Sequence, residues 1–166
     1  LQGRHNYENI AATYAVLQAL NYEFDFKKLE NFKGLPHRQE VVFQGDDIVV
    51  INDSKATNID STLSFLESIE AQYPSDVKVH LLMGGIAKKT GLEGLEKYKH
   101  RIAALYLYGE SQNLFSSFCD KHGIEFDVYD FFKNAVRDSL QKALENETRS
   151  IVALSPACAS FDLFKD

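Results

Sequence analysis

The segment INDSKATNIDST, residues 51–62, places an acid, a lysine and hydroxyls in the connection between two apolar runs. The run before it predicts a buried strand, and the run after it predicts an amphipathic helix. Lys55, beside the free N–H groups that begin a helix, could bind a phosphate or a carboxylate. Asp53 could accept ribose hydroxyls, hold a metal or orient the lysine. The alternative is that Asp53 or Ser54 caps the helix and Lys55 is solvated.

Three further segments offer groups that suit an anionic ligand. LPHRQE carries His37 and Arg38 after a proline turn, and arginine binds oxyanions through two parallel hydrogen bonds. SPACASFD offers Ser155 and Ser160 where Pro156 predicts the start of a helix. GRHNYEN places Asn9 one turn into a predicted helix. The alternatives are a hinge arginine paired on the surface and ordinary helix ends.

The loop MGGIAKKTG, residues 83–91, has the appearance of a phosphate-binding loop but does not fit one. A Walker A loop needs glycine at the positions of Met83 and Lys88. Gly84 and Gly85 still allow a close approach of backbone. Lys88 and Lys89 could meet a substrate carboxylate, or the loop could be a solvated basic segment. Cys158, among alanines and without a base, is predicted to be buried filler.

The composition narrows the function classes. The 166 residues carry a net charge of −6 with a pI near 5.4, which argues against nucleic-acid or anionic-membrane partners. Two distant cysteines predict neither a disulfide nor a metal site, and so favour a reducing cytoplasm. No apolar run reaches membrane-spanning length. The first residue is not methionine, so we expect a piece of a longer protein.

The elements that must position these residues follow from hydrophobic periodicity. Helices are predicted over 6–21, 24–32, 58–70, 91–99, 111–123 and 131–145, with Asn6 and Asp130 as caps. Strands are predicted over 77–83, 102–108, 125–129 and 150–155, and Gly45-Asp46 predicts a hairpin within 39–52. The alternation predicts an α/β fold: a Rossmann-like, doubly wound, mostly parallel sheet with an antiparallel hairpin edge. A short helical appendage precedes it, with the boundary at Gly34 and Pro36.

Taken together, the stretches GRHNYEN, GLPHRQE, INDSKATN and LSPACASFD resemble the Mur ligase family of ATP-dependent amide-bond ligases. DSKATN and SPACASFD resemble its D-glutamate-adding branch. The resemblance runs over the whole chain, although residues 90–148 hold no diagnostic motif. It implies that residues 1–33 are the tail of a central ATPase domain. It also implies that residues 34–166 are the C-terminal, amino-acid-binding domain, truncated at its end.

The resemblance also implies roles for single residues. Asn9, Arg38 and Asp53 match nucleotide contacts, and His37 and Lys55 support the phosphates and the transition state. The positions that match D-glutamate contacts are Thr57, Lys88, Ser160 and Phe161. The family has an acidic residue and a glycine before its lysine. Ile86 and Ala87 stand there in this chain, which leaves Lys88 and Lys89 as alternative contacts.

The implied reaction is ATP-dependent addition of D-glutamate to UDP-N-acetylmuramoyl-L-alanine through an acyl phosphate. It needs Mg²⁺, whose ligands we expect mainly outside this chain, together with N-terminal and central domains in cis. The chain alone is expected to be inactive, and the enzyme to be a cytoplasmic monomer. Two alternatives remain: a folylpolyglutamate-synthase-like ligase, and a non-catalytic α/β module that binds an acidic metabolite.

Overall fold

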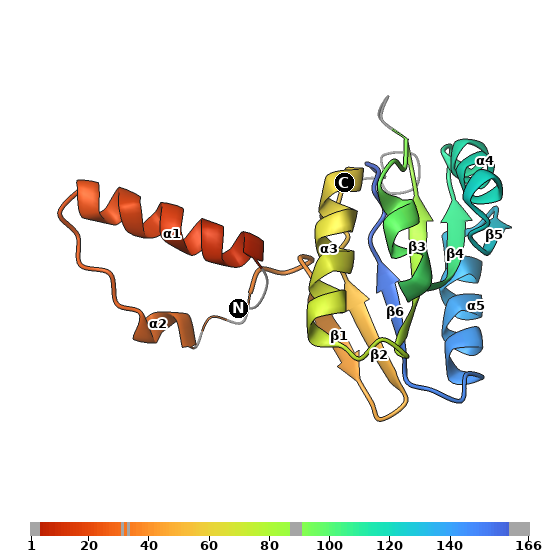
Figure 1. Cartoon of the computed structure of the whole chain (residues 1–166), viewed down its shortest axis with the longest axis horizontal. Coiled ribbons are helices and arrows are strands. Elements are labelled where there is room, and N and C mark those ends of the chain that lie inside the picture. Colours follow the sequence, from red (N-terminus) through yellow and green to blue (C-terminus); the bar gives the residue numbers. More distant parts are fainter. Residues whose placement is uncertain (1–3, 31, 33, 87–90, 160–166) are drawn as a thin grey trace.

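The computed structural model describes residues 4–30, 32, 34–86 and 91–159. Its N-terminal part consists of α1 (Arg4–Ala19) and the single-turn α2 (Lys27–Glu30), which lie to one side of the sheet (Figure 1). Because α1 already begins at Arg4, Asn6 lies inside the helix, and its prediction as the cap is wrong. The predicted second helix, residues 24–32, shrinks to one turn. Before it, the rings of Phe24 and Phe26 pack edge to face with centroids 4.6 Å apart.

The remainder is built on one six-stranded sheet in the order β1-β2-β6-β3-β4-β5. The strands are β1 (Glu40–Gln44), β2 (Ile48–Asn52), β3 (Lys78–Gly84), β4 (Ile102–Tyr108), β5 (Phe126–Tyr129) and β6 (Ser150–Leu154). The hairpin β1–β2 is antiparallel, and every other pair is parallel. The predicted α/β class, the parallel sheet and the hairpin edge are confirmed.

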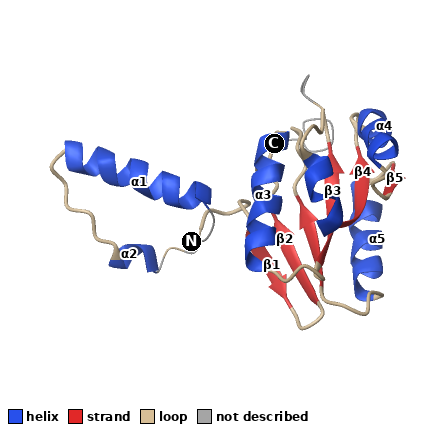
Figure 2. Ribbon diagram, in the orientation of Figure 1, coloured by secondary structure: helices blue, strands red, loops and turns tan. Residues whose placement is uncertain are grey.

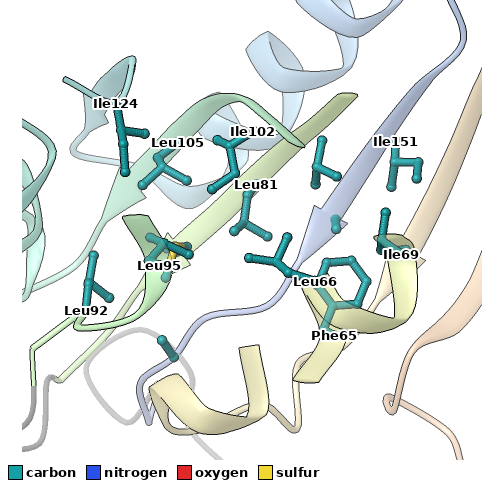
Figure 3. Close-up of a cluster of buried hydrophobic side chains, with 14 of the residues drawn as sticks. Phe65, Leu66, Ile69, Leu81, Leu92, Leu95, Ile102, Leu105, Ile124 and Ile151 are labelled. Carbon is teal, nitrogen blue, oxygen red and sulfur yellow. The ribbon is translucent and has the colours of Figure 1, made fainter. Parts of the chain in front are cut away.

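The helices cover both faces of the sheet, as Figure 2 shows. They are α3 (Ile59–Gln72), the 3-10 helix η1 (Leu95–Arg101), α4 (Gln112–His122) and α5 (Phe132–Leu144). One apolar cluster joins α3, η1 and α4 to the sheet and includes Phe65, Leu66 and Leu95 (Figure 3). The other joins α5 to the opposite face. Neighbouring β2 residues, Ile48 and Val49, belong to different clusters, as the period-two pattern of a strand buried on both faces requires.

The helix ends show which local signals held. Asn58 caps α3, and its side chain accepts the Ser61 N–H at 2.9 Å. Gly123 closes α4 in the left-handed region, with φ of 61°, as predicted. Asp130 is not a cap, because the N-cap of α5 is Phe131, whose side chain makes no capping hydrogen bond. In place of the helix predicted over 91–99, the structure has the 3-10 helix η1, which begins later, at Leu95, and ends at Arg101, directly before β4.

The topology brings three polar connections to one edge of the sheet. Strands β2, β6 and β3 are neighbours and run parallel, so their carboxyl ends lie together. The segments that follow them begin at Asp53, Ser155 and Gly85. This edge is where open α/β sheets bind ligands. Within the described ranges, no helix is long and apolar enough to cross a membrane.

Candidate functional site

A buried carboxylate connects the ends of β2 and β6. Asp53 is 5% exposed, and its Oδ2 accepts the hydroxyl of the fully buried Ser155 at 2.9 Å. Ser155 also lies 3.0 Å from the Thr62 hydroxyl, which in turn donates to the Ser155 carbonyl at 3.3 Å. The other carboxylate oxygen, Oδ1, accepts the Gln39 N–H at 3.1 Å. Asp53 therefore ties together β2, β6 and the segment before β1.

Burial changes the acidity of this group. Removal from water raises the pKa of Asp53 from 3.8 to about 6, against the opposing effects of the Ser155 and Gln39 hydrogen bonds and the nearby Arg38 charge. The carboxylate is still mainly ionised at neutral pH. It therefore places a fixed negative charge beside Arg38 at the carboxyl edge of the sheet.

Residues 36–39 form a tight loop against the end of β2, and we call it the linker loop. The His37 carbonyl accepts the Lys55 N–H at 3.1 Å. The His37 imidazole Nδ1 lies 2.9 Å from Asn52 Nδ2, and Asn52 Oδ1 accepts the Ser54 N–H. Because Asn52 Nδ2 can only donate, Nδ1 accepts, and the hydrogen of the neutral ring is on Nε2. His37 is thus held at one nitrogen and has a donor at the other.

The connection from β2 to α3 carries Lys55 and Thr57. The Lys55 side chain is exposed, and Thr57 is half-buried just before the start of α3. The Thr57 N–H is turned back onto the Lys55 carbonyl at 2.9 Å, so the chain makes a tight bend between the two residues. Two exposed cations from neighbouring segments, Arg38 and Lys55, therefore lie at this edge of the sheet with the His37 imidazole, and Arg38 is close enough to Asp53 to lower its pKa. Such a set can bind phosphate oxygens.

Gly84 and Gly85 allow a close approach of backbone, as predicted. The backbone that approaches them belongs to this chain and is not part of a ligand. A β-carbon on Gly84 would lie 1.9 Å from the Tyr108 carbonyl oxygen, and one on Gly85 would lie 2.4 Å from that of Ala159. Both residues have positive φ, 151° and 123°. These glycines let the end of β3 fit between β4 and the segment after β6.

The described part of SPACASFD, residues 155–159, is not helical, so the helix start predicted at Pro156 is not found there. Instead the Pro156 carbonyl accepts the Gly84 N–H at 3.1 Å, and the Ala159 carbonyl accepts the Ile86 N–H at 2.8 Å. Cys158 is buried, as predicted, with its sulfur 3.7 Å from the Ser111 hydroxyl. The segment bends at Ala157, whose φ is 57°, and these hydrogen bonds hold it across the end of β3.

The structure thus brings His37, Arg38, Asp53, Lys55 and Thr57 to one region. Asn9 lies on α1, where its carbonyl accepts the Thr13 hydroxyl at 2.8 Å, and that helix stands beside the sheet (Figure 1). Lys88, Ser160 and Phe161 lie outside the described residues.

Sequence reasoning missed four polar residues that organise this region: Gln39, Asn52, Thr62 and Ser68. A signal for two of them was available. Thr62 and Ser68 fall among the apolar positions of α3, and a hydroxyl on the buried face of a helix needs a partner. Gln39 and Asn52 gave no such signal.

Comparison with curated proteins finds relatives over the full length of the chain. The chain is 35% identical over 169 residues to the UDP-N-acetylmuramoylalanine–D-glutamate ligase of Rickettsia bellii, and spans 36% of that protein. It is 38% identical to the ligase of the same name from Caulobacter vibrioides, and spans 34% of it. The chain therefore spans about a third of the length of these relatives. It matches their C-terminal part.

Solved structures share the fold. Folylpolyglutamate synthase of Mycobacterium tuberculosis, solved with ADP and AMPPCP, superposes with a TM-score of 0.72 at 15% identity, over 95% of this chain and 39% of that chain. The UDP-N-acetylmuramoylalanyl-D-glutamyl-2,6-diaminopimelate–D-alanyl-D-alanyl ligase of Acinetobacter baumannii gives a TM-score of 0.65 at 18% identity, over 95% and 34%. No protein-family model matches the chain. Because its curated relatives are 32–38% identical to it along its whole length, the chain belongs to the Mur ligase family, as a C-terminal part.

Proposed function

We propose that the protein to which this chain belongs is an ATP-dependent ligase that adds D-glutamate to UDP-N-acetylmuramoyl-L-alanine, in the synthesis of peptidoglycan precursors. The observation that carries the proposal is the 32–38% identity, over the whole chain, to relatives with that activity in their names. The geometry is compatible with it. The segment DSKATN and the described part of SPACASFD meet at one edge of the sheet through the Asp53–Ser155 hydrogen bond.

On the nucleotide side of the proposed site, Arg38 and Lys55 bind the phosphate oxygens of ATP. Both are exposed cations at the carboxyl edge, and charge-assisted hydrogen bonds to phosphate are strong. Asp53 orients Arg38 and offers its remaining lone pairs to a ribose hydroxyl. The Nε2–H of His37 supports the transferred phosphoryl group, and Asn9 contributes from the central domain.

On the amino-acid side of the proposed site, the carboxylates of D-glutamate are held by Thr57, Lys88, Ser160 and Phe161. Thr57 stands just before the N-terminus of α3, where free N–H groups favour an anion. A dicarboxylate needs a cation and several donors, and Lys88 and Ser160 supply these groups. The residues of the chain bind and orient the reactants, and in-line phosphoryl and acyl transfer depends mostly on such positioning.

The residues present fit ATP in part and Mg²⁺ poorly. Two cations, an imidazole N–H and a carboxylate suit a nucleotide. Among the described residues, however, no group of three or more His, Cys, Asp or Glu side chains could hold a metal ion. We therefore assign the Mg²⁺ ligands to the rest of the protein.

The proposal extends to the arrangement of the whole protein. Residues 1–33 form the tail of the central ATPase domain, and residues 34–166 form the amino-acid-binding domain. The N-terminal and central domains act in cis. We propose a cytoplasmic monomer without a nucleic-acid or membrane partner.

The test uses the full-length protein with ATP, D-glutamate and UDP-N-acetylmuramoyl-L-alanine. Phosphate release should require all three, and mass spectrometry should show the acceptor extended by one glutamate. L-glutamate and a folate acceptor are the matched controls, and the 166-residue chain alone should release no phosphate. The folate acceptor decides the alternative, since the likeness to folylpolyglutamate synthase is one of fold at 15% identity. Glutamate added to folate, or no product that depends on D-glutamate, would overturn the proposal.

A further inference from the structure

The linker loop holds two residues in a backbone region that residues other than glycine rarely adopt. His37 has φ of 64° and Gln39 has φ of 49°. Such conformations persist where tertiary contacts hold them, and they cluster at functional sites. The residue between them, Arg38, is exposed and lies close enough to Asp53 to lower its pKa.

Gln39 is anchored at two points. Its N–H donates to Asp53 Oδ1 at 3.1 Å. Its side-chain Oε1 lies 2.8 Å from the Ser68 hydroxyl, which also lies 2.7 Å from the Phe65 carbonyl and shares its one hydrogen between the two acceptors. Both anchors are buried: Asp53 is 5% exposed and Ser68 is 4% exposed. Ser68 stands on the third turn of α3, away from the carboxyl edge of the sheet. The Gln39 side chain thus connects the linker loop to the helix that begins at the candidate site.

We propose that Gln39 is a positioning residue, which sets the direction in which Arg38 meets the phosphates of the nucleotide. The inference rests on the proposed nucleotide role of Arg38. The backbone on one side of Arg38 is fixed through His37, whose carbonyl accepts the Lys55 N–H at 3.1 Å. The backbone on the other side is fixed through Gln39. A flexible arginine side chain then starts from one fixed backbone direction, which lowers the entropy lost when it binds.

The first test is Ser68→Ala in the full-length protein, because Ser68 holds Gln39 without lying at the carboxyl edge. The variant removes the contact with Gln39 together with the bond to the Phe65 carbonyl, and loss of the Gln39 contact should raise the KM for ATP about two- to tenfold. The kcat and the KM for D-glutamate should stay within about twofold, since one anchor is lost and the other groups remain in place. Ser64→Ala is the matched control. Ser64 is also on α3, and its hydroxyl donates to the Asp60 carbonyl at 3.0 Å rather than to the linker loop.

The second test is a double-mutant cycle with Arg38→Ala. If Ser68 and Gln39 act through Arg38, adding Ser68→Ala to Arg38→Ala should raise the KM for ATP no further. Gln39→Met, which keeps the bulk and loses the amide, should behave as Ser68→Ala does. Effects that multiply, or a loss of thermal stability with an unchanged KM for ATP, would show a merely structural role and overturn the proposal.

A third measurement needs no enzymatic activity. In the 166-residue chain, Ser68→Ala should speed hydrogen exchange of the Gln39 amide at least about fivefold, and leave Val49 in β2 unchanged. An unchanged Gln39 amide would overturn the proposal. So would faster exchange combined with an unchanged KM for ATP. A full-length protein without D-glutamate ligase activity would instead defeat the proposed function, and the exchange result would still decide whether Ser68 anchors the loop.

Discussion

The Ser155 hydroxyl donates to Oδ2 of Asp53 over 2.9 Å, and joins two strand ends that are 102 residues apart in the sequence. The bond lies between neighbouring strands, β2 and β6, at the edge where the candidate ligand residues gather. It keeps a carboxylate out of water next to Arg38. The burial that fixes this carboxylate between the two strands makes its ionised form costly to the fold.

Asp53→Asn should therefore stabilise the 166-residue chain above pH 6. Burial raises the pKa of Asp53 from 3.8 to about 6, so the folded state favours the protonated acid. The contribution of Asp53 to the free energy of unfolding is fully present below pH 3.8 and is lost as the pH rises through 6. The loss amounts to at most about 3 kcal/mol. Asparagine keeps an acceptor for the Gln39 N–H and donates to Ser155, and it has no charge to bury.

Urea unfolding between pH 4 and pH 8 measures this difference. The variant and the parent should agree near pH 4 and diverge by pH 7. Asp46→Asn, which changes an exposed carboxylate in the hairpin turn, is the control. In the full-length enzyme, Asp53→Asn should weaken the use of ATP in spite of the added stability. A difference in stability that does not depend on pH would contradict the assignment.

His80 should give a pH dependence of the opposite sign. Burial, and then the Lys142 charge, lower its pKa from 6.5 to about 4. Nε2 lies 3.0 Å from Asn146 Nδ2 and Nδ1 lies 2.8 Å from the Tyr106 hydroxyl, so Nε2 accepts and has no room for a proton. Between pH 6.5 and 4 the unfolded chain binds more protons. Stability should therefore fall as the pH falls through this window, by at most about 3 kcal/mol.

His80→Gln removes the titrating ring and should flatten that part of the stability curve, even if it lowers stability at pH 8. The comparison is urea unfolding at half-unit steps from pH 4 to pH 8. His100→Gln is the matched control, because His100 is 57% exposed and pairs with Glu70 on the surface. If the control flattens the curve and His80→Gln does not, the source of the slope is not His80.

Gly84→Ala should be among the most damaging small substitutions in the sheet. The new methyl group would lie 1.9 Å from the Tyr108 carbonyl oxygen, on a backbone with φ of 151°. Steric overlap and backbone strain together should lower the free energy of unfolding by roughly 2–6 kcal/mol. Gly45→Ala is the control, since its nearest neighbour is the Phe43 side chain at 3.1 Å and its φ is not positive. Thermal unfolding of both variants measures the difference in stability. A Gly84→Ala chain as stable as the parent would refute the close packing of Gly84 against the Tyr108 carbonyl.

In the full-length enzyme, Lys88→Ala should raise the KM for D-glutamate about ten- to a hundredfold, and the KM for ATP far less. A hydrogen bond from a charged group to a carboxylate contributes roughly 1.5–3 kcal/mol. Steady-state kinetics should be compared with Lys89→Ala. A D-glutamate defect in Lys89→Ala alone would shift the contact by one residue. Two silent variants would remove the loop from the D-glutamate pocket.

Much of the fold was readable from the sequence. Period-two apolar runs, the Gly45-Asp46 turn and alternating helices predicted the parallel sheet and its hairpin edge, because those patterns are local. The order of motifs along the chain indicated the family from the sequence alone. Local cap signals failed at two helices. Asn6 and Asp130 have the chemistry of caps, but the helices begin at other residues.

The tertiary structure alone decided how the site is held together. Asp53 faces Ser155 because β2 and β6 are neighbours in the sheet, and a partner 102 residues away leaves no local pattern. Gly84 and Gly85 serve the close approach of Tyr108 and Ala159, which depends on strand packing. Side-chain hydrogen bonds and burial depend on which elements meet, whereas periodicity records only which face of an element is apolar. The sequence by itself therefore determined the elements and the candidate residues, and packing determined their partners.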